Sequence, residues 1–223
     1  MSVPVLTIDG PSGSGKGTLA QAVADSLGWH FLDSGALYRI IGAMCHYRKV
    51  ALAEDNEAAI AGMAAGLDIA FADGRVLVDD LNLTDEIRTE DAGVDASKVA
   101  ALPMVRDAVL DLQRSFRKAP GLVADGRDMG TVVFTTAPLK IFLEASAEER
   151  AQRRYKQLKN KGLSVSLPGL LEQIQERDAR DRGRAVAPLR PADDAIVIDS
   201  THLSIDEVLS QVLALVSEHG LNS

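Results

Sequence analysis

The sequence is poor in cysteine and in aromatic residues: its 223 residues include one cysteine, Cys45, and aromatic side chains make up 4%. A single cysteine excludes an intramolecular disulfide, so we expect a cytoplasmic protein. Long apolar runs are also missing, and crossing a bilayer takes roughly 18–20 apolar residues in a row. The apolar run at residues 3–8 is short and leads directly into a glycine-rich loop, unlike a signal peptide. We therefore expect no membrane partner.

Basic residues are outnumbered, with 24 Lys and Arg against 32 Asp and Glu and a net charge of −8. This balance argues against general nucleic-acid binding, which requires a basic surface. Residues 150–190 are an exception, because they contain eight Arg and three Lys but only two Glu and two Asp. Such a segment is typical either of a cleft that holds a small anion or of a solvated basic helix, and charge alone leaves both interpretations open.

The order of apolar runs and glycines predicts an α/β fold. Residues 3–8 form a β-prone run, residues 18–27 have helical periodicity closed by Gly28, and residues 29–32 form a second apolar run. A strand, a glycine loop, a helix and a strand in this order indicate a parallel sheet. By the same criteria we expect strands at 122–124, 140–143 and 195–198, and helices at 147–161, 168–184 and 205–219.

Residues 67–88 interrupt this alternation. Two strand-like runs, 68–72 and 75–79, flank Asp73 and Gly74, a pair that favours a hairpin turn. We therefore expect a small antiparallel insertion that spans about residues 62–100.

A glycine-rich segment lies between the first predicted strand and the first predicted helix. Glycines let successive backbone N–H groups turn inward around a polyphosphate, and the helix N-terminus adds partial positive charge. Lys16 supplies a cation for the β- and γ-phosphate oxygens, as in phosphate loops. The predicted ATP-binding segment consists of Gly10, Pro11, Ser12, Gly13, Ser14, Gly15, Lys16, Gly17 and Thr18.

Gly17 departs from the common phosphate loop, in which Ser or Thr directly follows the lysine and binds Mg²⁺. The hydroxyl comes one residue later here, at Thr18. Because glycine has no side-chain ligand, we expect Mg²⁺ to be held by phosphates, water and a nearby carboxylate. Asp125, at the end of the strand predicted at 122–124, is the candidate, and Asp33 is the alternative. Turn formation is the other interpretation of both aspartates.

The helix predicted at 168–184 continues an apolar face with charged residues. Leu170, Ile174, Arg177, Asp181 and Arg184 are spaced so that they share one face. Charged residues that extend a buried stripe are costly unless they meet a ligand or each other. The face therefore predicts either an anion site or an internal ladder of salt bridges such as Arg177 with Asp181.

Two further polar clusters follow predicted strands. The segment DGRDMG presents Arg127 and Asp128 at the carboxyl end of a strand, the edge where ligands bind in doubly wound sheets. The segment DSGALYR follows the second strand and places Ser34 at a helix N-terminus and Arg39 on its first turns. A plain helix cap is the alternative role of Ser34.

Together the segments GKGT, DSGALYR, LVADGRDMG and ERDARDRGR resemble the bacterial cytidylate kinases, a family of nucleoside monophosphate kinases. The resemblance runs from about residue 5 to the C-terminal helix. It implies a P-loop NTPase-like parallel sheet flanked by helices, with a small antiparallel insertion and a short helical lid. It further implies one domain, 1–223, with a monophosphate-binding insertion at about 34–118 and a lid at about 150–168, closing over ATP. The implied reaction moves the γ-phosphoryl group of ATP to CMP or dCMP, and we expect a monomer.

The resemblance also implies roles for individual residues. Arg39, Arg127 and Arg177 would bind the acceptor phosphate, and Asp181 would hydrogen-bond the sugar. Catalysis would depend on Lys16, Arg127 and Arg177. A monophosphate is already an anionic nucleophile near neutral pH, so this chemistry needs no general base, and the four histidines can be structural.

By the same resemblance the acceptor base would be read by Ser97, Asp128 and Arg184, with Arg106 near the same site and Ser34 in the substrate-binding set. The exocyclic amine of cytosine needs an acceptor such as Asp128 or Ser97, and its N3 and O2 suit the donors of Arg184. Asp128 can instead pair with an arginine.

Two other functions remain open at this point. A kinase of a sugar or a shikimate-like alcohol would need a base at the acceptor hydroxyl, and Asp128 fits that role. A non-catalytic nucleotide-binding switch would bind ATP without acceptor-dependent turnover.

Overall fold

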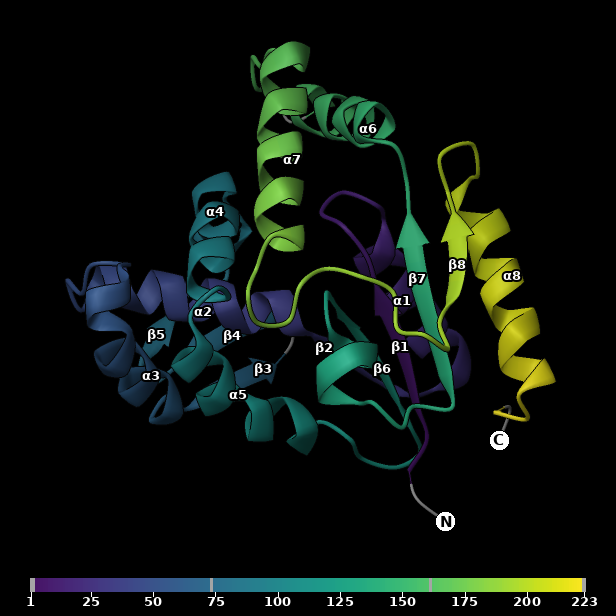
Figure 1. Cartoon of the computed structure of the whole chain (residues 1–223), viewed down its shortest axis with the longest axis horizontal. Helices are drawn as coiled ribbons and strands as arrows, with labels where there is room; N and C mark the ends of the chain where they lie inside the picture. Colours follow the sequence, from purple (N-terminus) through teal and green to yellow (C-terminus); the bar gives the residue numbers. More distant parts are fainter. Residues whose placement is uncertain (1–2, 73, 161, 222–223) are drawn as a thin grey trace. The chain divides into compact units, whose positions relative to one another are not determined.

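The computed structural model describes residues 3–72, 74–160 and 162–221 (Figure 1). The chain divides into two compact units. The first unit comprises Met1–Leu32 and Phe116–Ser223, and the second unit comprises Asp33–Ser115. In the described part of the chain, no helix is both long and apolar enough to cross a bilayer.

The first unit is built on a five-stranded sheet with the order β2-β6-β1-β7-β8 (Figure 1). β1 pairs in parallel with β6 and β7, and β7 pairs in parallel with β8. The predicted parallel sheet is thus confirmed, and each strand end lies within two residues of its predicted place. The strands are β1 (Val5–Asp9), β2 (His30–Asp33), β6 (Leu122–Gly126), β7 (Leu139–Glu144) and β8 (Ile196–Asp199).

The two central strands, β1 and β6, are buried along their whole length, as expected for parallel strands covered on both faces. Their register pairs Asp9 with Gly126, and Asp9 also pairs with Phe142 of β7. The loops that follow β1 and β6 consequently start next to each other. They start at the carboxyl edge of the sheet, where ligands bind in open α/β sheets.

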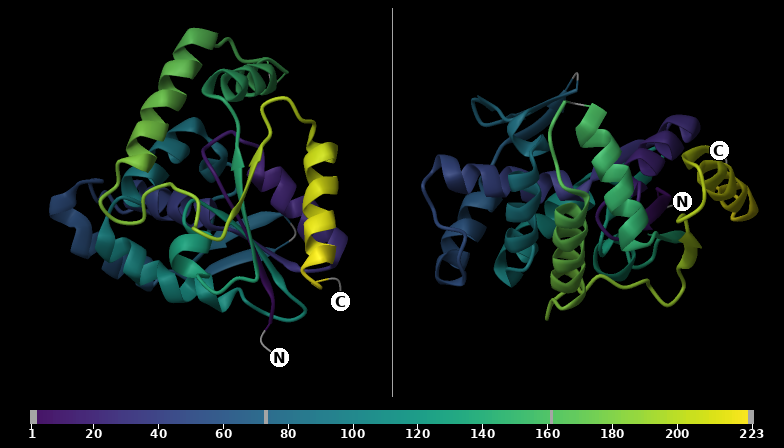
Figure 2. Two further views of the ribbon diagram at one scale, coloured as in Figure 1. Left: turned by 45° about the vertical axis from the view of Figure 1, so that its right-hand side comes forward. Right: turned by 90° about the horizontal axis from the view of Figure 1, so that it is seen from above.

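Helices flank this sheet. α1 packs against α8, and the two lie side by side in Figure 2. Leu19 and Val23 of α1 and Val212 of α8 form one apolar core cluster with Leu6 and Ile8 of β1. α6 packs against α7. The bounds are α1 (Lys16–Leu27), η3, a π-helical turn (Met129–Val133), α6 (Ala147–Asn160), α7 (Leu167–Arg182) and α8 (Ile205–Glu218).

The second unit is mainly helical and has its own apolar core, which includes Ile40, Ile41, Met44, Ile60 and Val99. The packing of α2 on α4 is close, because a Cβ at Gly42 would lie 3.1 Å from the Cβ of Asp95. Its helices are α2 (Ser34–Tyr47), η1 (Glu54–Asn56), α3 (Glu57–Ala65), η2 (Glu86–Arg88), α4 (Glu90–Val99) and α5 (Pro103–Ser115).

A small antiparallel sheet completes the second unit, as predicted. β3 (Ile69–Ala72) pairs with β4 (Arg75–Val78), and β4 pairs with a short third strand, β5 (Leu81–Asn82), that the sequence did not predict. Asp73, which we placed in the hairpin turn, lies outside the described residues.

The predicted functional segments fall within these elements. Residues 34–118 cover nearly the whole second unit, and residues 150–168 cover most of α6 and the start of α7. Lys161, in the predicted lid, lies outside the described residues. The division of one domain, 1–223, into a core, a monophosphate-binding insertion and a lid stays a prediction.

Candidate functional site

The glycine-rich loop begins directly after β1 and ends where α1 starts. This helix starts at Lys16, two residues earlier than predicted. Gly10 lies against β7, and a Cβ there would lie 2.2 Å from the carbonyl oxygen of Leu143. Gly15, the residue before α1, has a φ of +92°, which side chains other than glycine rarely adopt. The glycines thus allow both the close approach of the loop to β7 and its tight entry into α1.

Side chains hold the carbonyl groups of this loop. Nζ of Lys16 donates to Pro11 O at 3.2 Å, and Nη1 of Arg150 donates to Ser12 O at 3.0 Å. Ser14 O accepts from Nη1 of Arg153 at 3.3 Å and from Oγ of Ser200 at 3.4 Å. Side chains from α1, from α6 and from the residue after β8 therefore fix the backbone of the loop.

Lys16 and Asp125 lie close together beneath the loop. The two side chains are about nine-tenths buried, and Nζ lies 3.9 Å from Oδ1 of Asp125. A Cβ at Gly17 would lie 3.2 Å from Oδ2 of the same carboxylate. Asp125 therefore occupies the direction in which a Ser or Thr side chain would point from position 17. Asp33, the alternative, is an N-cap, because its Oδ1 accepts from Ala36 N at 3.0 Å.

Asp9 is a buried carboxylate that the sequence analysis missed as a site residue. It accepts from the backbone N–H groups of Met129 and Gly130 at 2.9 and 2.8 Å. Burial, with added repulsion from Asp128 and Asp125, raises the pKa of Asp9 from 3.8 to about 7, although the two N–H donors act in the opposite direction. An aspartate at the end of an otherwise apolar buried strand was the available signal.

Three predicted acceptor-binding residues meet in the first unit. Nε of Arg127 donates to Oδ2 of Asp181 at 3.1 Å, and Nη2 of Arg184 donates to Oδ1 of the same carboxylate. The side chain of Asp181 is only 1% exposed. Both oxygens of Asp181 thus join arginines that come from the end of β6 and from the segment after α7. Of the predicted polar face, Asp181 and Arg184 form an ion pair, whereas the pair of Arg177 with Asp181 stays a prediction.

Arg184 corrects one detail of the prediction. We placed it on the helix at 168–184, but α7 ends at Arg182 and Gly183 follows as its C-cap. Arg184 therefore reaches Asp181 from a turn and does not continue the helical face. Arg177 does lie on α7, half-buried, one turn before Asp181, and Asp128 is buried at the start of η3.

The remaining predicted acceptor residues belong to the second unit. Ser34 is the first residue of α2 and is buried, but the cap of this helix is Asp33, so the interpretation of Ser34 as the N-cap is wrong. Arg39 also lies on α2, and Ser97 is buried on α4. The guanidinium of Arg106 on α5 lies over the ring of Tyr38, 5.7 Å from its centroid, and its Nη1 donates to Ala100 O.

A cavity of about 530 Å³ opens beside the phosphate loop in the first unit. Its wall combines loop residues with the segment between β8 and α8, residues 200–204, and with the start of α8. The sequence analysis assigned no role to this segment. The lining includes Ser14, Gly15, Thr18, Leu143, Arg153 and His202.

Residues 6–218 match a protein family described as cytidylate kinase. The chain belongs to the cytidylate kinase family. A cytidylate kinase from Aeromonas hydrophila is 58% identical over 219 residues, covering 96% of this chain and 94% of the relative. A cytidylate kinase from Methylococcus capsulatus is 58% identical over 221 residues, covering 98% and 99%. A solved structure of shikimate kinase from Acinetobacter baumannii has a TM-score of 0.47 and 18% identity, covering 97% of this chain and 94% of that chain.

In this member of the cytidylate kinase family, the first unit brings together Lys16 with Asp125, and Arg127 with Asp181 and Arg184. Among the described residues, no group of three or more His, Cys, Asp or Glu side chains is arranged to hold a metal ion. Asp125, beside Lys16, stays the candidate carboxylate for Mg²⁺.

Proposed function

We propose that this protein transfers the γ-phosphoryl group of ATP to CMP or dCMP, giving ADP and CDP or dCDP. The observation that carries the proposal is the pairing of two polar loops on neighbouring strands. The phosphate loop follows β1, and the segment with Arg127 and Asp128 follows β6, whose last residue pairs with the last residue of β1. A donor polyphosphate site and an acceptor anion site at one sheet edge suit phosphoryl transfer.

The phosphate loop is the proposed site of the donor. Gly10, Pro11, Ser12, Gly13, Ser14, Gly15, Lys16, Gly17 and Thr18 would bind the phosphates of ATP. The cavity beside Gly15 and Thr18 would hold the nucleoside half of ATP, because it opens directly from the loop and has room for a base and a sugar. Asp125 would orient a hydrated Mg²⁺, which neutralises charge on the phosphates when bound.

Arginines are the proposed ligands of the acceptor phosphate: Arg127 and Arg177 in the first unit and Arg39 in the second. Arg127 uses Nε for Asp181 and Nη1 for Gly126 O. Each guanidinium has five donors, so Arg127 can keep the contact with Asp181 while it offers others to phosphate. The ion pair with Asp181 would thus hold Arg127 in place for its role in catalysis, together with Lys16 and Arg177.

The nucleoside part of the acceptor would be bound by the other predicted residues. Asp181 would accept from the sugar, and Asp128 and Arg184 would read the base together with Ser97. We also propose contacts from Ser34 and Arg106. Uracil would present a carbonyl and an N–H where cytosine has an amine and a ring acceptor, so its buried polar partners would lack matching groups.

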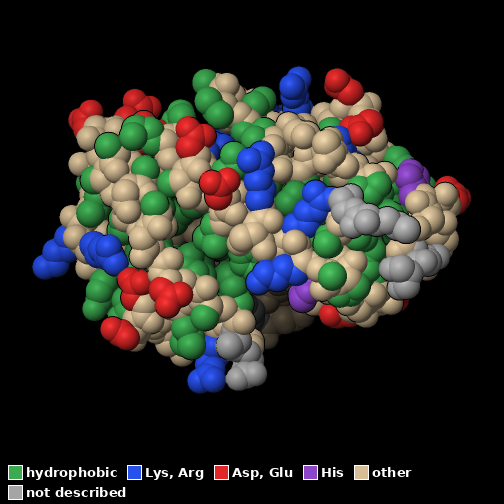
Figure 3. Space-filling view, turned by 90° about the horizontal axis from the view of Figure 1, so that it is seen from below, with side chains coloured by type: hydrophobic (Ala, Val, Ile, Leu, Met, Phe, Trp, Pro, Cys, Tyr) green, Lys and Arg blue, Asp and Glu red, His purple; other side chains and the backbone are tan. Residues whose placement is uncertain are grey.

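The proposal also covers the oligomeric state, the location and the partners of the protein. We propose a monomer that works in the cytoplasm without a nucleic-acid or membrane partner. Both acidic and basic side chains are exposed on the face in Figure 3.

An acceptor panel tests the proposed function. ADP release from ATP and Mg²⁺ would be measured with CMP, dCMP, UMP, AMP, shikimate and gluconate as acceptors. We expect strong stimulation by CMP and dCMP and weaker stimulation by UMP. Stimulation by an alcohol but by no nucleoside monophosphate, or ATP binding without turnover, would overturn the proposal.

A further inference from the structure

Arg150 lies within the predicted lid, but its guanidinium is engaged with the protein. Nε donates to Ala145 O at 2.9 Å, and Nη1 donates both to Ser12 O and to Oδ1 of Asp178 at 3.0 Å. Nη2 donates to Oδ2 of Asp178. Only 4% of the Arg150 side chain and 17% of the Asp178 side chain are exposed. The buried side chain of Arg150 therefore connects the phosphate loop, Ala145 just before α6, and α7.

The contact with the phosphate loop fixes the direction of a backbone amide. In a trans peptide the carbonyl and the following N–H point in opposite directions. Because Arg150 holds Ser12 O, the N–H of Gly13 points away from Arg150. Arg153, one turn further along α6, holds Ser14 O at 3.3 Å in the same manner. Two residues of α6 thus orient alternate peptides of a loop whose N–H groups are its phosphate ligands.

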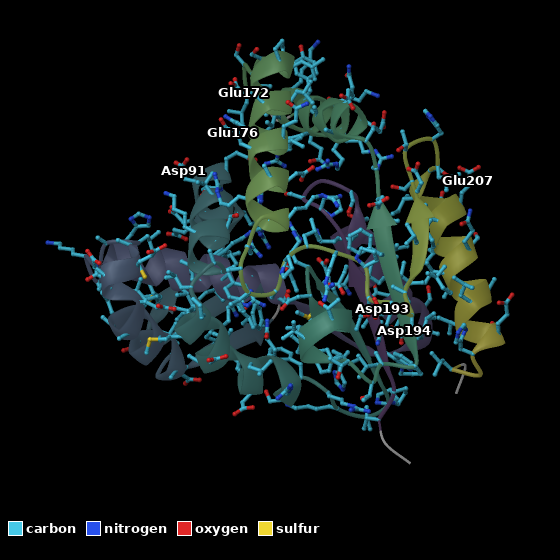
Figure 4. The ribbon with its side chains drawn as sticks, viewed as in Figure 1. Asp91, Glu172, Glu176, Asp193, Asp194 and Glu207 are labelled. Atoms are coloured by element: carbon cyan, nitrogen blue, oxygen red, sulfur yellow. The ribbon has the colours of Figure 1, made fainter. Side chains whose placement is uncertain are left out.

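The side of α7 that faces α6 contributes the carboxylate of this arrangement. α6 and α7 pack together, and Asp178 makes a two-oxygen contact with Arg150 across that interface. Glu172 and Glu176 project from the side of α7 away from α6 (Figure 4). Asp178 therefore differs from these exposed glutamates in being partly buried against a cation. Leaving either member of such a pair without the other is costly.

We propose that Arg150 and Asp178 are positioning residues for phosphoryl transfer: Asp178 holds the guanidinium, and Arg150 directs the Gly13 amide of the phosphate loop toward the donor phosphates. The inference rests on the proposed role of this loop as the ATP site. It gives Arg150 a different role from that of a lid arginine that touches phosphate itself. The acceptor side is held separately, because Asp181 has Arg127 and Arg184 as partners.

Binding measurements on the full chain test this inference. The dissociation constants of a non-hydrolysable ATP analogue and of CMP, each alone, would be measured by calorimetry for Asp178→Asn, Arg150→Lys, Arg150→Met and the double variant Arg150→Met/Asp178→Leu. The double variant removes both charges, so it avoids a lone buried ion and keeps the test open if a single variant does not fold. Circular dichroism would verify folding.

We expect Asp178→Asn and the double variant to weaken the ATP analogue about tenfold or more, because small misplacement of phosphate ligands is costly. CMP affinity should change less than about threefold, since the partners of Asp181 remain in place. Arg150→Lys should bind the analogue better than Arg150→Met, because an ammonium can still donate to Ser12 O. The control pair Arg48→Met/Asp79→Asn, which removes an exposed ion pair of 2.9 Å and suits the positive φ of position 79, should leave both affinities unchanged.

Three outcomes would overturn the inference while the proposed function stands. They are unchanged ATP affinity in the double variant, equal weakening of ATP and CMP, and weakening by Arg150→Met without any effect of Asp178→Asn. The last result would identify Arg150 as a direct phosphate ligand. Absence of ATP binding by the unaltered protein would instead overturn the proposed function and this inference with it.

Discussion

The carboxylate of Asp9 and the backbone of Gly130 are joined by a buried hydrogen bond of 2.8 Å, in which the Gly130 N–H donates to Oδ2. Asp9 is the last residue of β1 and directly precedes the phosphate loop. Its main chain therefore starts the proposed donor loop, while its side chain holds the turn that follows Arg127 and Asp128. Asp9 thus contacts both loops, one through its main chain and the other through its side chain.

Replacing Asp9 should change how stability depends on pH. A pKa of about 7 in the folded protein, against 3.8 as the ordinary value, means that the folded state binds the proton more tightly. The stabilisation is full below about pH 4 and is lost as the pH rises to about 7. Relative to Asp9→Asn, the free energy of unfolding of the unaltered protein should fall across this range by at most about 4 kcal/mol. Urea denaturation from pH 4 to 8 measures this, and parallel curves would contradict it.

Replacing Lys16 should remove activity and leave the fold intact. Lys16→Ala deletes the cation that we assign to the β- and γ-phosphates, so kcat should fall by about 100-fold or more. Circular dichroism would verify the fold, because the substitution also removes the buried contacts of Lys16 with Pro11 O and with Asp125. The exposed Lys118→Ala serves as the control and should have normal kinetics. A kcat of Lys16→Ala within threefold of normal would exclude the phosphate-loop role.

Replacing Asp128 should separate the two substrates. Asp128→Ala removes the proposed acceptor for the cytosine amine, which should weaken CMP by about 1–3 kcal/mol, or roughly 5- to 150-fold. ATP affinity should change much less. Calorimetric titration with each nucleotide measures both values. Equal weakening of CMP and ATP would show that Asp128 supports the structure and does not read the base.

The two candidate carboxylates for Mg²⁺ can be distinguished kinetically. Asp125→Asn should raise the Mg²⁺ concentration for half-maximal turnover by about fivefold or more, because Asp125 lies beside Lys16 and Gly17. Asp33→Asn should act mainly on stability, by about 1 kcal/mol, through the cap of α2. Titrations of turnover with Mg²⁺ and thermal denaturation of both variants test this. A larger Mg²⁺ effect at Asp33 would reverse the assignment.

The sheet of the first unit could be predicted from the sequence because its strands are short and mainly apolar, and all but β7 end at aspartate or glycine. The phosphate loop could also be predicted, because its glycines and its lysine lie close together in the sequence at a characteristic spacing. The helices α3 to α5 were not predicted, although α5 has an amphipathic pattern in which Val105 and Val109 are buried. The pattern of residues 168–184 also continued past the true end of α7, and only the geometry shows that Gly183 ends it.

The contacts that support the site depend on residues far apart in the sequence. The hydrogen bond between Asp9 and Gly130 joins positions 121 residues apart, and that between Arg150 and Ser12 joins positions 138 apart. No local pattern distinguishes Arg150 from the other basic residues of α6. Sequence reasoning could therefore propose which residues bind the substrates, but it could not find the residues that hold them.

The pairing of Asp9 with Gly126 fixes how far the loop after β1 lies from the turn after β6 along the strand direction. Sliding β6 by one residue along β1 would shift the acceptor turn by about 3.3 Å relative to the phosphate loop. This shift is as large as the distance at which reacting atoms must be held, about 3–3.5 Å. In the proposed reaction, the register of β6 on β1 would therefore set the spacing between donor and acceptor in steps of one residue, and side chains would make the finer adjustment.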